Sequence, residues 1–374
     1  MSSSKLLPLN SRAATTALKQ PKEIASFSRT FDGEYVNDDS SLGYYFLPDS
    51  DIETNIDLGA GFKKFKKFDE ARDGEFDGLL GAIKNYEETN KTKVKAHIIT
   101  WRGIMTKLLT LPYNLNDPLD FNVVYFDGHL FIQEDKALKT ARETKPTDEH
   151  ARLMYSGYKF ESIATLPKPL AQVSRATIDK NHKKIVSNAE QYCSIVKTGI
   201  GKQRIIIGGE VDCVWDYKPE DSNPLPHYVE LKTSKVISEP KHSIIFEKKL
   251  FRTWAQCFLL GISKVIYGFR DDNLILRTVE QYKVDEIPVL IKNNPVNTNP
   301  KRINCIDALK WYGAVVEWIV ENVPKDESKA FRISYDNKNK SFALNELPSD
   351  VSDNVLSTML TEDFKNWRLQ KRNE

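Results

Sequence analysis

Residues 192–233 of the 374-residue chain, YCSIVKTGIGKQRIIIGGEVDCVWDYKPEDSNPLPHYVELKT, decide the fold. Four runs rich in β-branched and aromatic residues are separated by Gly or by Pro, Asp and Asn: 192–198, 203–207, 210–217 and 227–233. Such runs, bounded by turn residues, are typical of consecutive strands. The stretch therefore predicts a meander of four strands.

Helix and strand patterns alternate on both sides of this stretch. Residues 98–111 predict a strand that leads into a helix, and Asp127-Gly128 lies between two β-rich runs, as in a two-residue hairpin. Further elements are expected at 246–261 (a helix ending at Gly261), 265–269 (a buried strand), 306–323 (a helix before Pro324) and 331–335 with 341–344 (a hairpin). Together they predict an α+β fold, a mixed twisted β-sheet core with flanking helices.

The domain organisation follows from the apolar pattern. Residues 1–20 are rich in Ser and Thr and have no apolar period, so we expect a flexible N-terminal arm. Residues 21–374 are expected to form a single domain, since 40% of the chain is hydrophobic. No run of eighteen apolar residues occurs, so neither secretion nor membrane insertion is expected.

Charge and cysteine content narrow the function classes. With 54 basic and 52 acidic residues the net charge is +2, which excludes a global basic field, so any binding of nucleic acid must be local. The basic cluster at residues 63–67 fits a nuclear-import signal, a phosphate contact or a solvated surface. The four cysteines form no CxxC pair, which argues against zinc and disulfides and for a reducing compartment.

Acidic side chains gather on one face of the predicted strands. Because side chains alternate along a strand, Glu210 and Asp212 share a face, as do Glu230 and Lys232. If the two strands pair, three carboxylates and one ammonium converge, which is unfavourable unless a cation binds. Oxygen ligands without His or Cys favour Mg²⁺ or Mn²⁺, and such a site suits attack of water on phosphorus. The alternative is two edge strands with solvated charged faces.

Several spaced motifs also resemble one family, the DXO family of RNA 5′-end decapping nucleases, and most closely its yeast nuclear member, which partners a 5′-to-3′ exoribonuclease. The resemblance covers nearly the whole chain and implies a fold related to the PD-(D/E)xK nucleases. It rests on TTALKQPKEI (15–24), YYFLP (44–48), ITWRG (99–103), GYKFE (157–161), GGEVDC (208–213), HYVELKTS (227–234) and FRTWAQCFLLG (251–261).

The resemblance implies roles for individual residues. The implied metal ligands, for Mg²⁺ or Mn²⁺, are Glu161, Glu210, Asp212, Glu230 and the main-chain carbonyl of Leu231. The implied catalytic residues are Asp212, Glu230, Lys232 and Gln256, of which Lys232 and Gln256 contact the water and the scissile phosphate. The implied substrate-binding residues are Trp101, Arg102, Gly103, Cys193, Glu210, Lys232 and Gln256, with Arg29 a weaker candidate. Taken singly, Arg102 also fits a surface ion pair, Cys193 simple packing and Gln256 an exposed helical position.

The implied activity is hydrolysis at RNA 5′ ends. It includes removal of pyrophosphate from 5′-triphosphate RNA and of incompletely methylated or NAD caps, leaving a 5′-monophosphate for a nuclear 5′-to-3′ exoribonuclease. Two alternatives stay open at this stage. The protein could serve chiefly as a scaffold for that exoribonuclease, or it could be a DNA nuclease on the same metal core.

Overall fold

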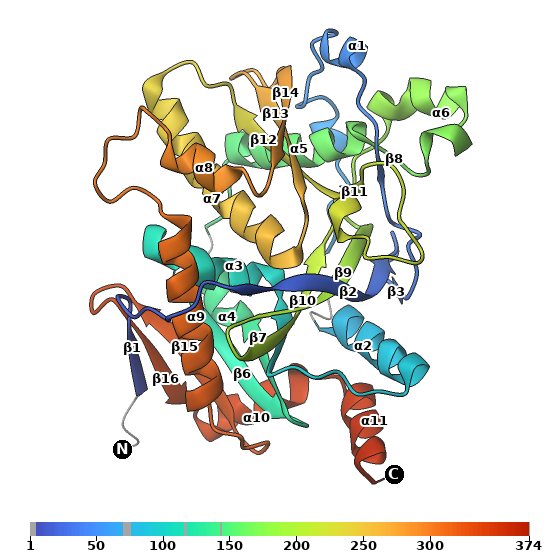
Figure 1. Cartoon of the computed structure of the whole chain (residues 1–374). Coiled ribbons are helices and arrows are strands. Elements are labelled where there is room, and N and C mark those ends of the chain that lie inside the picture. The colour runs from blue at the N-terminus through green and yellow to red at the C-terminus, as the bar shows by residue number, and fades with distance from the viewer. Residues whose placement is uncertain (1–4, 70–75, 116–117, 143, 374) are drawn as a thin grey trace.

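Two mixed β-sheets form the framework of the computed structural model, which describes residues 5–69, 76–115, 118–142 and 144–373 (Figure 1). The larger sheet has the order β1 (Lys5–Pro8), β16 (Ser341–Glu346), β15 (Ala330–Asp336), β6 (Asp120–Phe126), β7 (His129–Glu134), β5 (Ile98–Trp101), β10 (Gln203–Glu210), β9 (Gln191–Ile200), β2 (Leu18–Arg29) and β3 (Tyr35–Val36). The smaller sheet has the order β14 (Leu276–Lys283), β13 (Lys264–Arg270), β12 (Tyr228–Lys235), β11 (Cys213–Val214), β4 (Tyr44–Tyr45) and β8 (Thr165–Leu166). In the larger sheet two central parallel pairs are flanked by antiparallel pairs, and in the smaller sheet parallel and antiparallel pairs alternate. This pairing confirms the mixed α+β fold.

Helices flank both sheets. They are α1 (Asp49–Ile52), α2 (Asp77–Asn90), α3 (Arg102–Thr110), α4 (Lys136–Arg142), α5 (Asp148–Ile163), α6 (Arg175–Lys180), α7 (Pro240–Leu260), α8 (Ile287–Lys292), α9 (Cys305–Asn322), α10 (Ser349–Thr358) and α11 (Glu362–Asn373). Helices α5 and α7 pack on the smaller sheet, and α3 packs on α7 and α9. Within the described residues, no helix combines the length and apolar character needed to cross a membrane.

Local signals in the sequence placed several element ends correctly. Asp127 (φ 47°) and Gly128 (φ 85°) adopt the left-handed conformation of a two-residue hairpin between β6 and β7. Helix α7 ends at Gly261, whose φ of 85° forms the expected C-cap. The helix at α9, the strand at β13 and the hairpin β15–β16 are confirmed within a few residues.

The predicted four-strand meander is wrong in its connectivity. Strands β9 and β10 pair in the larger sheet, whereas β11 and β12 pair in the smaller one, so the chain changes sheet between Glu210 and Cys213. At the crossing, the Val211 N–H donates to the Tyr192 carbonyl and the Leu231 N–H donates to the Asp212 side chain. The segment 210–217, which the alternation pattern predicted as one strand, is therefore divided between the two sheets.

The expected flexible arm is also corrected at Lys5–Pro8. These residues form β1, which pairs with β16 at the edge of the larger sheet, and Leu7 is buried against the core. Arg12 then forms a bidentate ion pair with Asp307 at the start of α9. The Ser/Thr-rich composition concealed this strand because it spans only 4 residues, too few to show an apolar period.

Candidate active site

The acidic residues predicted from the sequence lie where the two sheets meet. Glu210 is the last residue of β10, Asp212 lies in the crossing, and Glu230 lies in β12. Strand β11 pairs with β12 through Cys213 and Val229, which places Asp212 beside Glu230. Asp212 Oδ2 accepts a hydrogen bond of 2.6 Å from the Leu231 N–H. The crossing thus brings carboxylates from both sheets to one place.

Glu230 is the most enclosed of these carboxylates, with an exposed fraction of 1%. Arg102, the first residue of α3, reaches it from the other sheet with Nη1 2.8 Å from Oε2. Lys232 Nζ lies 2.5 Å from its Oε1 and 4.0 Å from Asp212 Oδ2. Because β12 lies between β11 and β13, the alternative of a solvated edge strand is excluded.

The pKa values show how closely the acidic groups interact. Burial, together with the charge of Glu230, raises the pKa of Asp212 to about 7. Burial and the charge of Asp212 raise the pKa of Glu161, on α5, well above its usual value, and burial raises that of Glu210. Burial also opposes ionisation of Glu230, but the charges of Arg102 and Lys232 outweigh it and lower its pKa to about 2.

These shifts indicate a site short of positive charge. Three of the four carboxylates lose part of their tendency to ionise, which a bound cation would restore. Within the described part of the chain, no three His, Cys, Asp or Glu side chains already converge as a complete metal site. Glu230 instead faces Arg102 and Lys232. The donor chemistry, all carboxylate oxygen, nevertheless fits a hard divalent cation.

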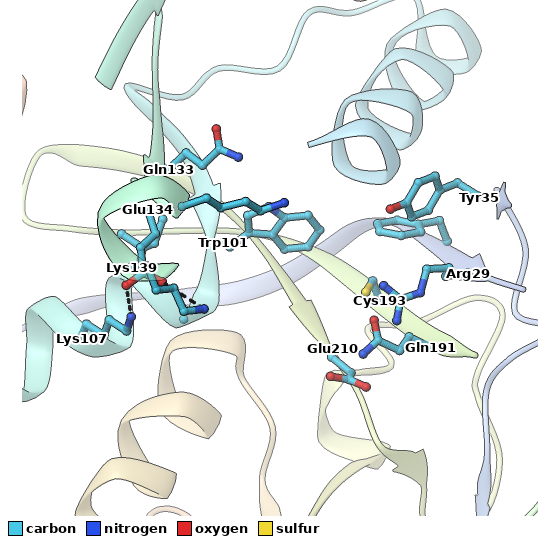
Figure 2. A pocket seen from close by; sticks show the side chains of 14 residues that line it. Arg29, Tyr35, Trp101, Lys107, Gln133, Glu134, Lys139, Gln191, Cys193 and Glu210 are labelled. Atoms are coloured by element: carbon cyan, nitrogen blue, oxygen red, sulfur yellow. Dashed lines mark hydrogen bonds and ion pairs between the residues drawn. The ribbon is translucent and has the colours of Figure 1, made fainter. Parts of the chain in front are cut away.

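A cavity of about 350 Å³ opens beside Glu210 (Figure 2). It contains four of the predicted substrate residues, Trp101, Gly103, Cys193 and Glu210, together with Arg29. Its other lining residues are Phe27, Tyr35, Ile104, Lys107, Gln133, Glu134, Lys136, Lys139 and Gln191. Aromatic rings form one wall and lysines the opposite one, as Figure 2 shows for Tyr35, Trp101, Lys107 and Lys139.

The lysines of this cavity, and its aromatic residues other than Trp101, were missed from the sequence. Lys107 has a detectable signal, because it follows Gly103 by one helical turn and so shares its face of α3. Phe27 likewise precedes Arg29 by two positions on β2 and shares its side of the strand. Lys136 and Lys139, on the short helix α4, have no such local signal.

The surroundings of three predicted residues, Arg102, Arg29 and Gln256, differ from those of a free substrate-binding side chain. Arg102 points to Glu230 and is not among the residues that line the cavity. Arg29 is held by the carbonyls of Ala189 and Asn188 and lies over the Phe68 ring. Gln256 is partly exposed on α7 beside Cys257, whose pKa is raised by burial and by the charge of Glu230. This influence of the Glu230 charge on Cys257 indicates that this turn of α7 lies near the carboxylates, and the substrate roles stay predictions.

Comparison with known proteins assigns the chain to a family. A family model described as RAI1 like PD-(D/E)XK nuclease matches residues 19–365. The chain belongs to this RAI1-like nuclease family. The resemblance to decapping nucleases is thereby confirmed, and the protein is an enzyme of a nuclease family.

Curated members of the RAI1-like family match over almost the full chain. A decapping nuclease RAI1 of Debaryomyces hansenii is 53% identical over 380 residues, covering 98% of both chains. That of Saccharomyces cerevisiae is 40% identical over 382 residues, covering 96% of both chains.

Two solved structures of RAI1-like family members are also similar. Candida albicans Rai1 in complex with pU5-Mn²⁺ matches with a TM-score of 0.95 and 50% identity, covering 98% of this chain and 99% of that one. Scheffersomyces stipitis Rai1 in complex with (3′-NADP)⁺ and calcium matches with a TM-score of 0.91 and 52% identity, covering 98% and 100%.

Proposed function

We propose that the protein is a divalent-metal-dependent hydrolase that acts on RNA 5′ ends. The observation that carries this proposal is that Glu161, Glu210, Asp212 and Glu230 lie close enough to shift one another's pKa, with Lys232 paired to Glu230, beside a cavity of nucleotide size. The decapping nucleases that match this chain, one of them in complex with pU5 and Mn²⁺, support it.

The four carboxylates and the main-chain carbonyl of Leu231 would hold Mg²⁺ or Mn²⁺. When bound, such a cation lowers the pKa of water and offsets charge on the phosphate oxygens. Lys232, which is 30% exposed, presents its ammonium beside the same carboxylates and can contact a phosphate oxygen. Arg102 keeps Glu230 ionised despite its burial, so Glu230 is available as an anionic ligand.

The cavity beside Glu210 suits the 5′-terminal group of the RNA. Its volume of about 350 Å³ lies in the range of small-ligand sites. Trp101 and Tyr35 offer ring faces or edges to a base, and Lys107 and Lys139 lie where phosphates would follow. We assign to it 5′-triphosphate ends, incompletely methylated caps and NAD caps. The S. stipitis complex with (3′-NADP)⁺ supports the NAD cap.

We further propose that the protein acts in the nucleus and partners a 5′-to-3′ exoribonuclease. Hydrolysis at the first phosphodiester leaves a 5′-monophosphate end, which is the product such an exoribonuclease needs. The basic residues Lys63, Lys64, Lys66 and Lys67 fit a nuclear-import signal. A second candidate function, supported by the same resemblance, is a scaffold for the exoribonuclease with hydrolysis secondary.

The experiment compares matched RNAs that carry a 5′-triphosphate, an unmethylated cap, an NAD cap or a 5′-monophosphate, with Mg²⁺ or Mn²⁺. Asp212→Asn and Glu230→Gln should each lower kcat roughly a hundredfold or more, because each removes one charge from the cation site. Glu220→Gln, which removes an exposed carboxylate from the loop after β11, should leave kcat unchanged.

Two outcomes would redirect the proposal. Absence of hydrolysis by the wild type on every end, with exoribonuclease binding retained, would make the protein a scaffold. Equal hydrolysis of DNA of matching sequence would make it a general nuclease, because recognition of RNA requires contacts to the 2′-hydroxyl.

A further inference from the structure

A second cavity, of about 640 Å³, lies between α3 and α7. It is formed by the N-terminal half of α7, the end of α3 with the 3₁₀ turn Leu111–Tyr113, and residues 297–303. Five of its lining residues are cationic and one is a carboxylate. The cationic residues, named here the basic groove, are Lys248, Lys249, Arg252, Lys301 and Arg302.

Helix α7 connects the basic groove to the carboxylates. Burial and the charge of Glu230 both raise the pKa of the thiol of Cys257 on this helix. One turn earlier, Thr253 Oγ1 lies 2.7 Å from Tyr267 Oη. A further turn earlier, Lys249 Nζ lies 3.4 Å from Ser234 Oγ. Tyr267 is the β13 partner of Lys232. Successive turns of α7 therefore follow β12 from Glu230 past Lys232 to Ser234.

These contacts define a path along one face of β12. Glu230, Lys232 and Ser234 share that face because side chains alternate along a strand. From Cys257 to Lys249 the helix advances about 12 Å. Lys249, the groove residue that contacts Ser234, thus lies about 12 Å along the helix from Cys257.

Helix α3 makes the same connection from the opposite side. Gly103 and Lys107 line the cavity for the 5′-terminal group, and Thr110 lines the basic groove. These three residues are spaced by four and three positions, so they lie on one face of the helix. Both helices therefore lead from the proposed active site to the groove.

A buried carboxylate holds the outer wall of the groove. Glu247, 4% exposed, accepts hydrogen bonds of 2.6 Å from Nδ2 of Asn294 and from Nδ2 of Asn297. These bonds fasten the segment that carries Lys301 and Arg302 to α7. Because Glu247 is engaged in them, the accessible side chains of the groove are predominantly positive.

We infer that the basic groove binds the phosphates of single-stranded RNA downstream of the scissile bond. This rests on the proposed function. The net charge of only +2 means that affinity for the RNA chain must come from a local cluster, and α7 and α3 connect this groove to the carboxylates. The half-buried ring of Tyr113, which packs edge-on against buried Phe251 with the ring centroids 5.5 Å apart, adds the aromatic surface that such grooves combine with cations.

The test compares two substrates, a 5′-triphosphate dinucleotide and a long single-stranded 5′-triphosphate RNA. The triple variant Lys248→Gln, Lys301→Gln, Arg302→Gln removes three exposed cations of the groove. The control is Lys183→Gln, Lys325→Gln, Lys338→Gln, three exposed lysines outside both cavities. The groove variant should raise KM for the long RNA roughly tenfold, leaving kcat and the dinucleotide unchanged.

Binding of the long RNA, followed by fluorescence anisotropy, gives a second readout. The slope of log Kd against log salt should fall by about 2 in the groove variant, from about 0.7 for each lost phosphate contact, and stay constant in the control. Equal effects on both substrates, or an unchanged salt slope, would overturn the inference. Failure of the proposed function is distinct, because the wild type would then hydrolyse neither substrate.

Discussion

His129 is a buried residue whose ionisation opposes folding. It is 3% exposed, its Nδ1 lies 2.9 Å from the Ala96 carbonyl, and its Nε2 has no hydrogen-bond partner among the described residues. Burial, with the positive charges of Arg368 and Lys93, lowers its pKa to about 4. In the folded protein the ring therefore stays neutral, as a donor to Ala96, at every pH above that value.

This shift predicts a pH dependence of stability. In the unfolded chain His129 takes up its proton near pH 6.5, whereas in the folded protein it does so only near pH 4, so acid favours the unfolded state. The free energy of unfolding should fall by up to about 3 kcal/mol between pH 6.5 and 4. Urea unfolding of the wild type and His129→Gln should show a shallower decline in the variant. Parallel pH profiles would contradict this assignment.

The ion pair between Arg102 and Glu230 could not be predicted from the sequence. The resemblance implied a substrate-binding role for Arg102, and the residue taken singly also fitted a surface ion pair. In the structure its side chain is buried and donates to Glu230, 128 positions away in β12 of the smaller sheet. No local pattern encodes such a pair, because it depends on how α3 approaches β12. The carboxylates, by contrast, were identifiable because strand alternation alone puts Glu230 and Lys232 on one face.

At the scale of elements, α5 depends on close packing against β13. A Cβ at Gly268 would lie 2.6 Å from Cε2 of Phe160, a fully buried ring next to Glu161. Gly268→Ala must therefore displace α5, at a cost of about 1–3 kcal/mol, and move Glu161 from the carboxylate cluster. Urea unfolding and hydrolysis of triphosphate RNA should both show losses.

The matched control is a glycine of α5 itself, Gly157. A Cβ at Gly157 would meet only Thr233 Oγ1, at 3.9 Å, and alanine favours a helix by up to about 1 kcal/mol over glycine. Gly157→Ala should therefore keep or raise stability. If Gly268→Ala were as stable and active as Gly157→Ala, α5 would not be positioned by this contact.

Element ends could be predicted where a single residue determines them, and sheet membership could not. Gly261 and Asp127-Gly128 end their elements through backbone conformations that favour those residues. The division of β9, β10, β11 and β12 between two sheets depends on long-range partners such as β5 and β13. These partners lie far away in the sequence and leave no trace in the alternation of side chains.

At the scale of the whole molecule, the C-terminal helix is joined to the larger sheet by a buried ionic cluster. Arg368, 2% exposed, donates to Glu87 on α2 (2.6 Å) and to Asp127 in the β6–β7 turn (2.9 Å). Helix α11 lies at the end of the molecule away from the smaller sheet (Figure 1). The cluster therefore contributes to stability without touching the active site.

Arg368→Met should lower the free energy of unfolding by about 3–5 kcal/mol, because buried Glu87 loses its ion-pair partner, whereas Asp127 keeps its pairs with Lys93 and Arg372. The kcat of the folded fraction should not change. Arg175→Met, which breaks an exposed ion pair with Asp179, should cost less than about 1 kcal/mol. Urea unfolding measures the stability of both variants. Equal losses of unfolding free energy would show that the buried ionic cluster does not stabilise the packing of α11.

The crossing between Glu210 and Cys213 also has a consequence for synthesis of the protein. Glu161, Glu210 and Asp212 leave the ribosome before the loop that follows β11, and Glu230 and Lys232 leave after it. A nascent chain that ends in this loop holds three of the four acidic residues and cannot complete the site, since β12 with Glu230 has not yet formed. The nascent enzyme is therefore inactive during translation, and it becomes active only when β12 pairs with β11 and the smaller sheet packs against the larger one.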